Sequence, residues 1–258
     1  MTADEHFQAA LQARSLSFEV DEDGCYHVQV GELTATVDLE NVRRNYERDG
    51  DAEAVKRFAE QLDVNPFASR PSWDEVRPLL RYLLTPPKRD VGPDDTLYEP
   101  VADELEKIFV YTSPDGSRLS WIAPSMLTEW GVDRSEVIAA ADENMDQLFD
   151  AVELETLTSD GVSVGTFSLD DTHFKASLIL SPRFKTLVSP SYGWPVYVVA
   201  PARDFVYILA TDDSDLLSRL GGVVLKEFTA SGHPVTADVL EASDTGITAI
   251  GTFQSRDE

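Results

Sequence analysis

The sequence predicts an α+β protein, with mainly antiparallel sheets and helices packed on them, arranged in two units. Short segments of alternating apolar and polar residues are separated by turns rich in glycine, proline and aspartate, a pattern typical of antiparallel hairpins. Apolar residues at helical spacing interrupt these segments. Because strands and helices do not alternate regularly, antiparallel hairpins are favoured over a parallel sheet.

The first part of the chain predicts a helix, a three-stranded meander over residues 18–39 and a second helix. The apolar positions that mark the helices are Phe7, Ala10 and Leu11 in the first, and Val55, Phe58, Ala59 and Leu62 in the second. Asp23-Gly24 and Gly31-Glu32 are the turns expected within the meander. Cys25 lies in a predicted strand, where a small buried apolar role is expected.

A third helix is predicted to begin at Ser72-Trp73-Asp74-Glu75. In this capping box the serine hydroxyl and the glutamate carboxylate satisfy free backbone N–H groups. Trp73, Val76, Leu80 and Leu83 would line one side of the helix, with Pro78 kinking or restarting it. Residues 86–95 contain three prolines and no periodicity. We therefore expect a linker within residues 86–100, between an N-terminal unit at 1–87 and a C-terminal unit at 96–258.

The C-terminal unit is expected to begin with a hairpin that turns at Ser113-Pro114-Asp115-Gly116. Two helices should follow, one capped by Ser125 and ending at Gly131, the other capped by Asp133 and Glu136. The remaining expected elements are a hairpin over 152–168, strands over 174–180 and 195–210, a helix from Asp212 that carries Leu216, Leu217 and Leu220, and a last strand over 247–253.

The charge of the chain excludes several classes of partner. The 258 residues carry a formal net charge of −26, from 47 acidic and 21 basic side chains. Nucleic-acid binders neutralise phosphates with clustered lysine and arginine, so we expect neither nucleic acid nor an anionic membrane as partner. Cys25 is the single cysteine, and Met1 to His6 show no secretory signal, so we expect a cytoplasmic location.

The acidic residues themselves allow three interpretations. They form a hydrated surface coat, they reflect adaptation to a saline environment, or they present an acidic face to a basic partner. The excess of 27 aspartates and 15 arginines over 20 glutamates and 6 lysines suits all three.

No set of residues predicts a metal or a catalytic centre, and we expect no cofactor. The four histidines, His6, His27, His173 and His233, are isolated from one another in the sequence. Asp21, Asp23 and Glu32 match three positions of a calcium loop, but Tyr26 replaces the glycine that its turn requires. Asp142, Glu143 and Asp146 lack the histidine partners of a di-iron site. Cys25 and His27 could meet on one strand face, without a third group to orient them.

Two short segments supply candidate interaction residues. Tyr192 and Trp194 stand between Pro190 and Pro195 in a predicted loop, and exposed tyrosine and tryptophan are frequent anchors in protein contacts. The alternative is that this loop packs on its own core. Arg203 and Asp204 stand at a predicted strand reversal, where Asp204 could instead cap the backbone.

Several segments of the C-terminal part resemble the YtpQ-like family of conserved bacterial proteins of unknown function. The segments are residues 111–122, Met126-Leu127, Trp130-Gly131-Val132 and the helix with Asn144, then 176–180, 195–210 and Gly232-His233-Pro234. The resemblance covers roughly residues 96–245 and implies a soluble, cytoplasmic bacterial protein. It implies no catalytic residue.

Together these observations predict a cytosolic, non-catalytic protein that acts through protein–protein interaction, as a chaperone-like or regulatory module. The alternative is a hydrolase that uses carboxylates or a metal, since the many acids supply numerous possible pairs. A third hypothesis is an immunity-type protein whose acidic surface binds a basic partner tightly.

Overall fold

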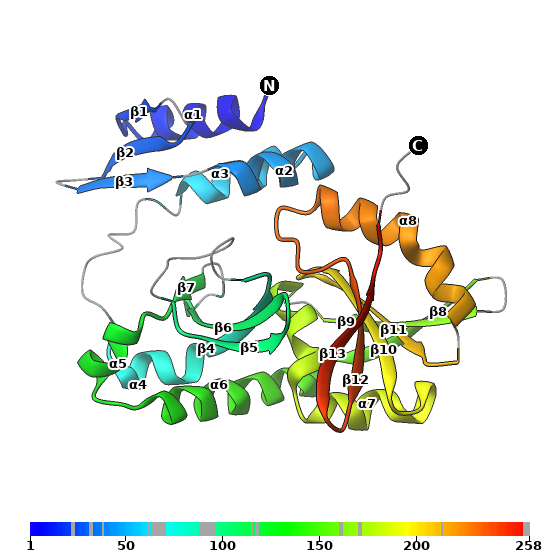
Figure 1. The fold of residues 1–258 in the computed structure, drawn as a ribbon. Coiled ribbons are helices and arrows are strands. Elements are labelled where there is room, and N and C mark those ends of the chain that lie inside the picture. Colours follow the sequence, from blue (N-terminus) through cyan, green and yellow to red (C-terminus); the bar gives the residue numbers. More distant parts are fainter. Residues whose placement is uncertain are drawn as a thin grey trace. The chain divides into compact units, whose positions relative to one another are not determined.

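The computed structural model describes residues 1–21, 24–30, 33–37, 39–60, 62, 71–87, 96–114, 116, 119–159, 162–169, 172–212 and 214–254. Within these ranges the chain has the predicted α+β fold, with helices packed on antiparallel sheets (Figure 1). It divides into an N-terminal unit, Met1–Arg70 with Ala230–His233, and a C-terminal unit, Pro71–Thr229 with Pro234–Glu258. None of the described helices combines the length and the apolar character that crossing a membrane requires.

The described part of the N-terminal unit is a three-stranded antiparallel sheet with three α-helices. Its elements are α1 (Ala3–Ala13), β1 (Phe18–Val20), β2 (Tyr26–Val30), β3 (Leu33–Val37), α2 (Glu40–Asp49) and α3 (Ala52–Glu60). The middle strand is β2, and its alternate residues Tyr26 and Val28 face a buried core. Phe7 and Leu11 of α1 and Val55 of α3 lie in the same core.

The predicted first helix and the meander are confirmed, and so is the helix that carries Val55, Phe58 and Ala59, which ends at Glu60. Helix α2 was not predicted. The sequence of α2 carries no clear apolar stripe, and none of its ten residues has a fully buried side chain. Gly50 ends the helix in a left-handed conformation with φ of 67°. The predicted turn residues Asp23, Gly31 and Glu32 lie outside the described residues.

The C-terminal unit begins with a four-stranded sheet and helices. Its elements are α4 (Trp73–Val76), β4 (Leu80–Thr85), β5 (Tyr98–Ala102), β6 (Leu105–Thr112), β7 (Leu119–Trp121), α5 (Pro124–Trp130) and α6 (Arg134–Leu148). The longest strand, β6, pairs with β4 along one edge and with β5 and β7 along the other. The predicted 108–122 hairpin and the Asp133–Glu136 capping box are confirmed. Helix α5 ends at Gly131 as predicted but begins at Pro124, with Ala123 rather than Ser125 as its N-cap.

The helix predicted from Ser72 to Leu83 is wrong beyond Val76. A 3-10 turn at Arg77–Leu79 follows α4, and Leu80 then starts β4. Pro78 cannot donate a backbone hydrogen bond, which favours the break. The buried side chain of Asn144 on α6 stabilises the break between the helix and the strand. Its amide donates hydrogen bonds to the carbonyls of Arg77 at 2.7 Å and Leu80 at 3.1 Å.

This strand also moves the boundary between the units. Because β4 pairs with β6 over residues 80–85, residues 71–87 belong to the C-terminal unit. The division falls at Arg70–Pro71, rather than between a unit at 1–87 and one at 96–258. Residues 88–95 of the predicted linker lie outside the described residues.

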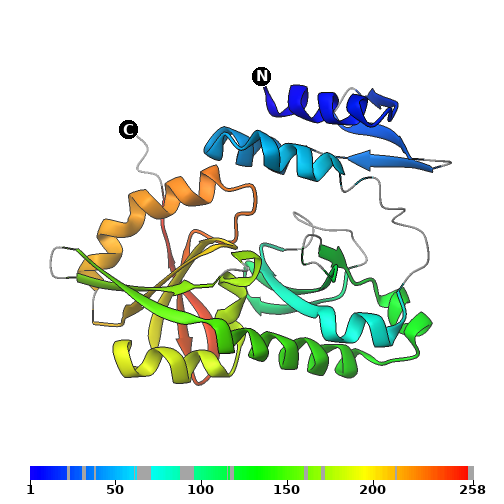
Figure 2. The same cartoon turned by 180° about the vertical axis from the view of Figure 1, so that it is seen from behind.

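The rest of the C-terminal unit is a six-stranded antiparallel sheet with a helix on each face. Its elements are β8 (Glu153–Ser159), β9 (Val162–Ser168), α7 (Arg183–Tyr192), β10 (Val196–Ala202), β11 (Phe205–Ala210), α8 (Ser214–Ala230), β12 (Asp238–Ser243) and β13 (Gly246–Thr252). The strand order is β13-β12-β10-β11-β9-β8. Both views show α7 and α8 on opposite sides of this sheet (Figures 1 and 2).

Alternation along the central strands assigns side chains to the two faces. Val198 and Ile208 point into the large core that this sheet shares with the four-stranded sheet of the same unit. Val199 and Leu209, on the opposite face, pack under Val224 of α8. The predicted 152–168 hairpin, the 195–210 hairpin, the helix after Asp212 and the last strand are confirmed, and β12 was not predicted.

The strand predicted over 174–180 is wrong. This segment forms 3-10 turns at Thr172–Phe174 and Ala176–Leu180. The apolar residues of this segment are buried in the large core. A short apolar run is compatible with either a buried strand or a buried turn, so the sequence pattern could not distinguish the two.

Candidate functional site

Tyr192, predicted to lie in an exposed loop, is the last residue of α7 and only 7% exposed. Its ring packs against Gly165 of β9, where an added Cβ would come within 2.9 Å of the ring. Its hydroxyl lies 2.9 Å from the hydroxyl of Thr156 on β8. Tyr192 therefore belongs to the core rather than to an exposed binding loop, which was the alternative left open by the sequence.

Trp194 is half-buried and makes its polar contacts within the C-terminal unit. Its indole N–H donates to Oδ1 of Asp244 at 2.9 Å. Lys185 lies against the same carboxylate, with Nζ 2.6 Å from Oδ1 and 5.4 Å from the centre of the indole ring. These hydrogen bonds, from Lys185 first and Trp194 second, lower the pKa of the Asp244 carboxyl. The indole thus already has a cation and an anion of its own chain beside it.

Arg203 and Asp204 form the turn between β10 and β11, and both are half-buried. The carbonyl of Arg203 accepts a hydrogen bond of 2.9 Å from the backbone N–H of Ala176. The seven residues of β10 separate this turn from Trp194, which at about 3.3 Å per residue is roughly 20 Å. The two predicted pairs therefore do not meet in one site.

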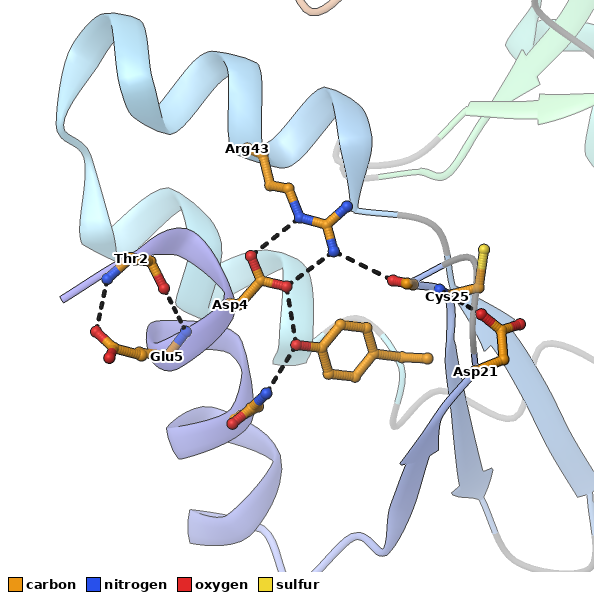
Figure 3. Close-up of polar contacts among 9 residues, drawn as sticks. Thr2, Asp4, Glu5, Asp21, Cys25 and Arg43 are labelled. Carbon is orange, nitrogen blue, oxygen red and sulfur yellow. Dashed lines mark hydrogen bonds and ion pairs between the residues drawn. The ribbon is translucent and has the colours of Figure 1, made fainter.

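In the N-terminal unit, Arg43 is the centre of a polar network (Figure 3). Its guanidinium donates to both carboxylate oxygens of Asp4, at 2.9 and 2.8 Å, and to the carbonyl of Gly24 at 3.1 Å. The Tyr26 hydroxyl donates to Asp4 at 2.9 Å and accepts from Gln8 at 2.9 Å. The hydrogen bond from Arg43 is the main cause that lowers the pKa of Asp4. This network joins α1, β2 and α2, which is a structural role.

The two residues of the possible Cys–His pair, Cys25 and His27, both contact the neighbouring side chain of Asp21. Cys25 precedes β2 rather than lying in a strand, and it is half-buried rather than buried, which corrects the sequence prediction. Asp21 accepts the backbone N–H of Cys25 at 2.9 Å, and its other oxygen lies 3.0 Å from Nε2 of His27. Asp23 and Glu32 lie outside the described residues.

A second polar cluster lies between β6 and α6. The Nζ of Lys107 is 3.0 Å from Asp142, 3.5 Å from Glu99 and 4.4 Å from the centre of the Tyr82 ring. Burial is the main cause that raises the pKa of the Tyr82 hydroxyl, and the charges of Asp142 and Asp146 add to it. The charge of the lysine is compensated by its own neighbours, so this cluster is a partly buried set of ion pairs.

An open groove of about 370 Å³ lies on the surface of the C-terminal unit, between α4 and α6. We call it the Trp73 groove. It is lined by Trp73, Asp74, Arg77, Glu136, Ala139, Ala140 and Glu143. Both views show α4 alongside α6 (Figures 1 and 2). The four residues contributed by α6 follow the three- and four-residue spacing that places side chains on one helix face.

Small and large side chains shape this groove. Ala139 and Ala140 leave a depression between the carboxylates of Glu136 and Glu143. Trp73 forms one wall and is itself supported by Trp130, with ring centres 5.8 Å apart. The indole N–H of Trp130 donates to the carbonyl of Pro71 at 2.9 Å, which fixes the chain just before α4.

Three carboxylates and one guanidinium give the Trp73 groove a local excess of negative charge. Asp74 is exposed, and its carboxylate has no hydrogen bond or ion pair with any described residue. The carboxylate of Glu136 is partly engaged in the α6 cap, where it accepts a hydrogen bond from the backbone N–H of Asp133. Arg77 lies 3.5 Å from Glu143, and both side chains are about 60% exposed (59% and 61%). Chemically, an aromatic wall beside carboxylates suits a cation.

Sequence reasoning identified the two capping boxes that begin α4 and α6 but missed the groove between these helices. The sequence shows that Glu136, Ala139 and Glu143 lie on one helix face, but it does not show that this face lies beside Trp73. Within the described ranges, no group of three or more His, Cys, Asp or Glu residues could hold a metal ion. No protein-family description, curated protein or solved structure matches this chain.

Proposed function

We propose that this chain is a non-catalytic, cytoplasmic protein-binding module that recognises a basic partner through the Trp73 groove. The observation that carries the proposal is the groove itself, with its tryptophan wall and three carboxylates. Tryptophan is one of the residue types enriched among the energetically dominant positions of protein contacts. The proposal replaces Tyr192 and Trp194 as the binding residues, because these pack on their own unit.

The charge of the whole chain supports a basic partner. A net charge of −26 attracts cationic surfaces over the distance of a Debye length and repels nucleic acid. The groove adds a specific place where that attraction can become a contact, since the carboxylate of Asp74 is not already paired among the described residues. Membership of the YtpQ-like bacterial family is part of this proposal and rests on the sequence segments quoted above.

The proposal is tested by filling the groove without altering the fold. Ala139 is exposed on α6, and leucine is also a good helix former, so Ala139→Leu should fold normally. The matched control is Ala54→Leu, the same change at an exposed position of α3 in the other unit. Each protein is immobilised and incubated with bacterial lysate at about 50 mM salt, and the retained proteins are quantified by mass spectrometry.

We expect wild type and Ala54→Leu to retain the same basic proteins, and Ala139→Leu to lose most of them. Retention should also fall steeply toward about 300 mM salt, because rim charges act through screened attraction. Equal retention by all three proteins, or retention that does not change with salt concentration, would refute the proposal.

A further inference from the structure

We infer that the Trp73 groove takes a lysine or arginine side chain of the partner, and that Arg77 occupies this cation position in the unbound protein. The inference rests on the proposed function and specifies the chemistry of its site. A cationic side chain could place its charge over the indole of Trp73 while its donors reach Asp74 and Glu143. The groove volume of about 370 Å³ is sufficient for one extended side chain.

Arg77 already brings a positive charge to the rim of the groove. Among the described residues that line the groove, its guanidinium is the only cation, and it lies 3.5 Å from Glu143. The side chains on both sides of the contact are exposed, so water screens the attraction and the ion pair holds Arg77 only weakly. A partner cation can therefore displace Arg77 from Glu143 at little cost.

The backbone of Arg77 is fixed, whereas its side chain is not. Asn144 donates a hydrogen bond of 2.7 Å to the Arg77 carbonyl from within the core. The side chain is 59% exposed, and its contact to Glu143 is the ion pair described above. Arg77 is thus held at the rim of the groove while its guanidinium remains able to swing away when another cation arrives.

The alternative is that Arg77 recruits an anion, and the two possibilities predict opposite effects of removing it. If the groove receives a cation, Arg77→Met removes a competitor and a like charge, and the affinity for a cationic probe rises. If the groove receives an anion, the same variant loses the guanidinium that would bind it, and the affinity for an anionic probe falls. The sign of the change therefore decides between them.

The probe is an N-acetylated tetra-arginine amide, with tetraglutamate as the anionic comparison. Binding is followed at about 50 mM salt by two-dimensional NMR through the indole N–H signals. The chain has four tryptophans, so the signal of Trp73 can be assigned by its loss in Trp73→Phe and compared with that of Trp194. The matched control is Arg44→Met, which also removes an exposed, ion-paired arginine and changes the net charge equally.

We expect the peptide to shift the Trp73 indole signal and Arg77→Met to tighten binding about two- to fivefold relative to Arg44→Met, the factor that corresponds to losing an exposed ion pair. Glu143→Gln should weaken binding. Arg77→Met that weakens binding, or that matches Arg44→Met, would overturn the role of Arg77 while leaving the groove as a binding site. A Trp73 signal that stays unmoved by the peptide in every variant would remove the proposed function as well.

Discussion

Replacing Asn144 with alanine should destabilise the C-terminal unit by about 2–4 kcal/mol. The side chain is 7% exposed, and its amide donates to the carbonyls of Arg77 and Leu80 at 2.7 and 3.1 Å. Each hydrogen bond contributes about 0.5–1.5 kcal/mol, and a buried carbonyl left without a donor adds part of a desolvation cost of about 1–3 kcal/mol. The loss falls where α4 gives way to β4, so it weakens the junction of the two elements.

Urea unfolding followed by tryptophan fluorescence measures this effect in the right part of the chain. All four tryptophans, Trp73, Trp121, Trp130 and Trp194, belong to the C-terminal unit. With a slope of about 2–3 kcal/mol per molar urea, the midpoint should fall by roughly 1 M at an unchanged slope.

Two further variants make the result decisive. Asn144→Asp preserves the side-chain shape but presents oxygens to the two carbonyls, so it should destabilise at least as much as Asn144→Ala. Gln147→Ala, at an exposed position of the same helix, should stay within about 0.5 kcal/mol of wild type. If Asn144→Ala lies within about 1 kcal/mol of Gln147→Ala, the account of the α4–β4 junction is refuted.

Three other perturbations have expected outcomes in the same unfolding assay. Ser177→Ala should cost about 1–3 kcal/mol, because the buried backbone N–H of Leu84 donates to the Ser177 hydroxyl at 2.9 Å and would lose its acceptor; a change below about 0.5 kcal/mol would contradict this. Gly165→Ala should cost about 1–3 kcal/mol, since the new Cβ would come within 2.9 Å of the buried Tyr192 ring, and the additional variant Tyr192→Leu should relieve part of that cost if the clash is the cause. The raised pKa of Tyr82 means that this group ionises first in the unfolded state, so its contribution to stability should be constant below about pH 10 and be lost progressively above it; a Tyr82→Phe protein with the same alkaline decline would exclude Tyr82 as its source.

The local elements that the sequence predicted correctly are those with their own start and stop signals. Asp133 and Glu136 form a reciprocal cap at the beginning of α6, and Gly131 ends α5 in a left-handed conformation, as their positions indicated. The strand reversal at Arg203-Asp204 also lies where the sequence predicted it. These features depend on residues within a few positions of each other, so no knowledge of distant contacts was needed.

Elements with a long-range cause were predicted wrongly. The 80–85 segment has helical spacing of apolar residues, yet it pairs with β6, and Ser177 accepts one of its edge N–H groups. The segment between Pro190 and Pro195 has loop composition, yet Tyr192 ends α7 against Gly165. In both cases burial against a distant partner outweighed the local preference.

The sequence by itself determined the α+β class, the antiparallel hairpins, the caps of α4 and α6 and the strongly acidic charge. The tertiary structure alone decided where the two units divide, which aromatic side chains are buried, and that Trp73 and Arg77 meet Glu143 across two helices. The physical reason is distance along the chain. A cap or a turn is complete within about four residues. The groove, by contrast, requires α4 to end at Val76, just before Pro78, and to pack on α6, a helix some sixty residues later, where Asn144 holds the junction.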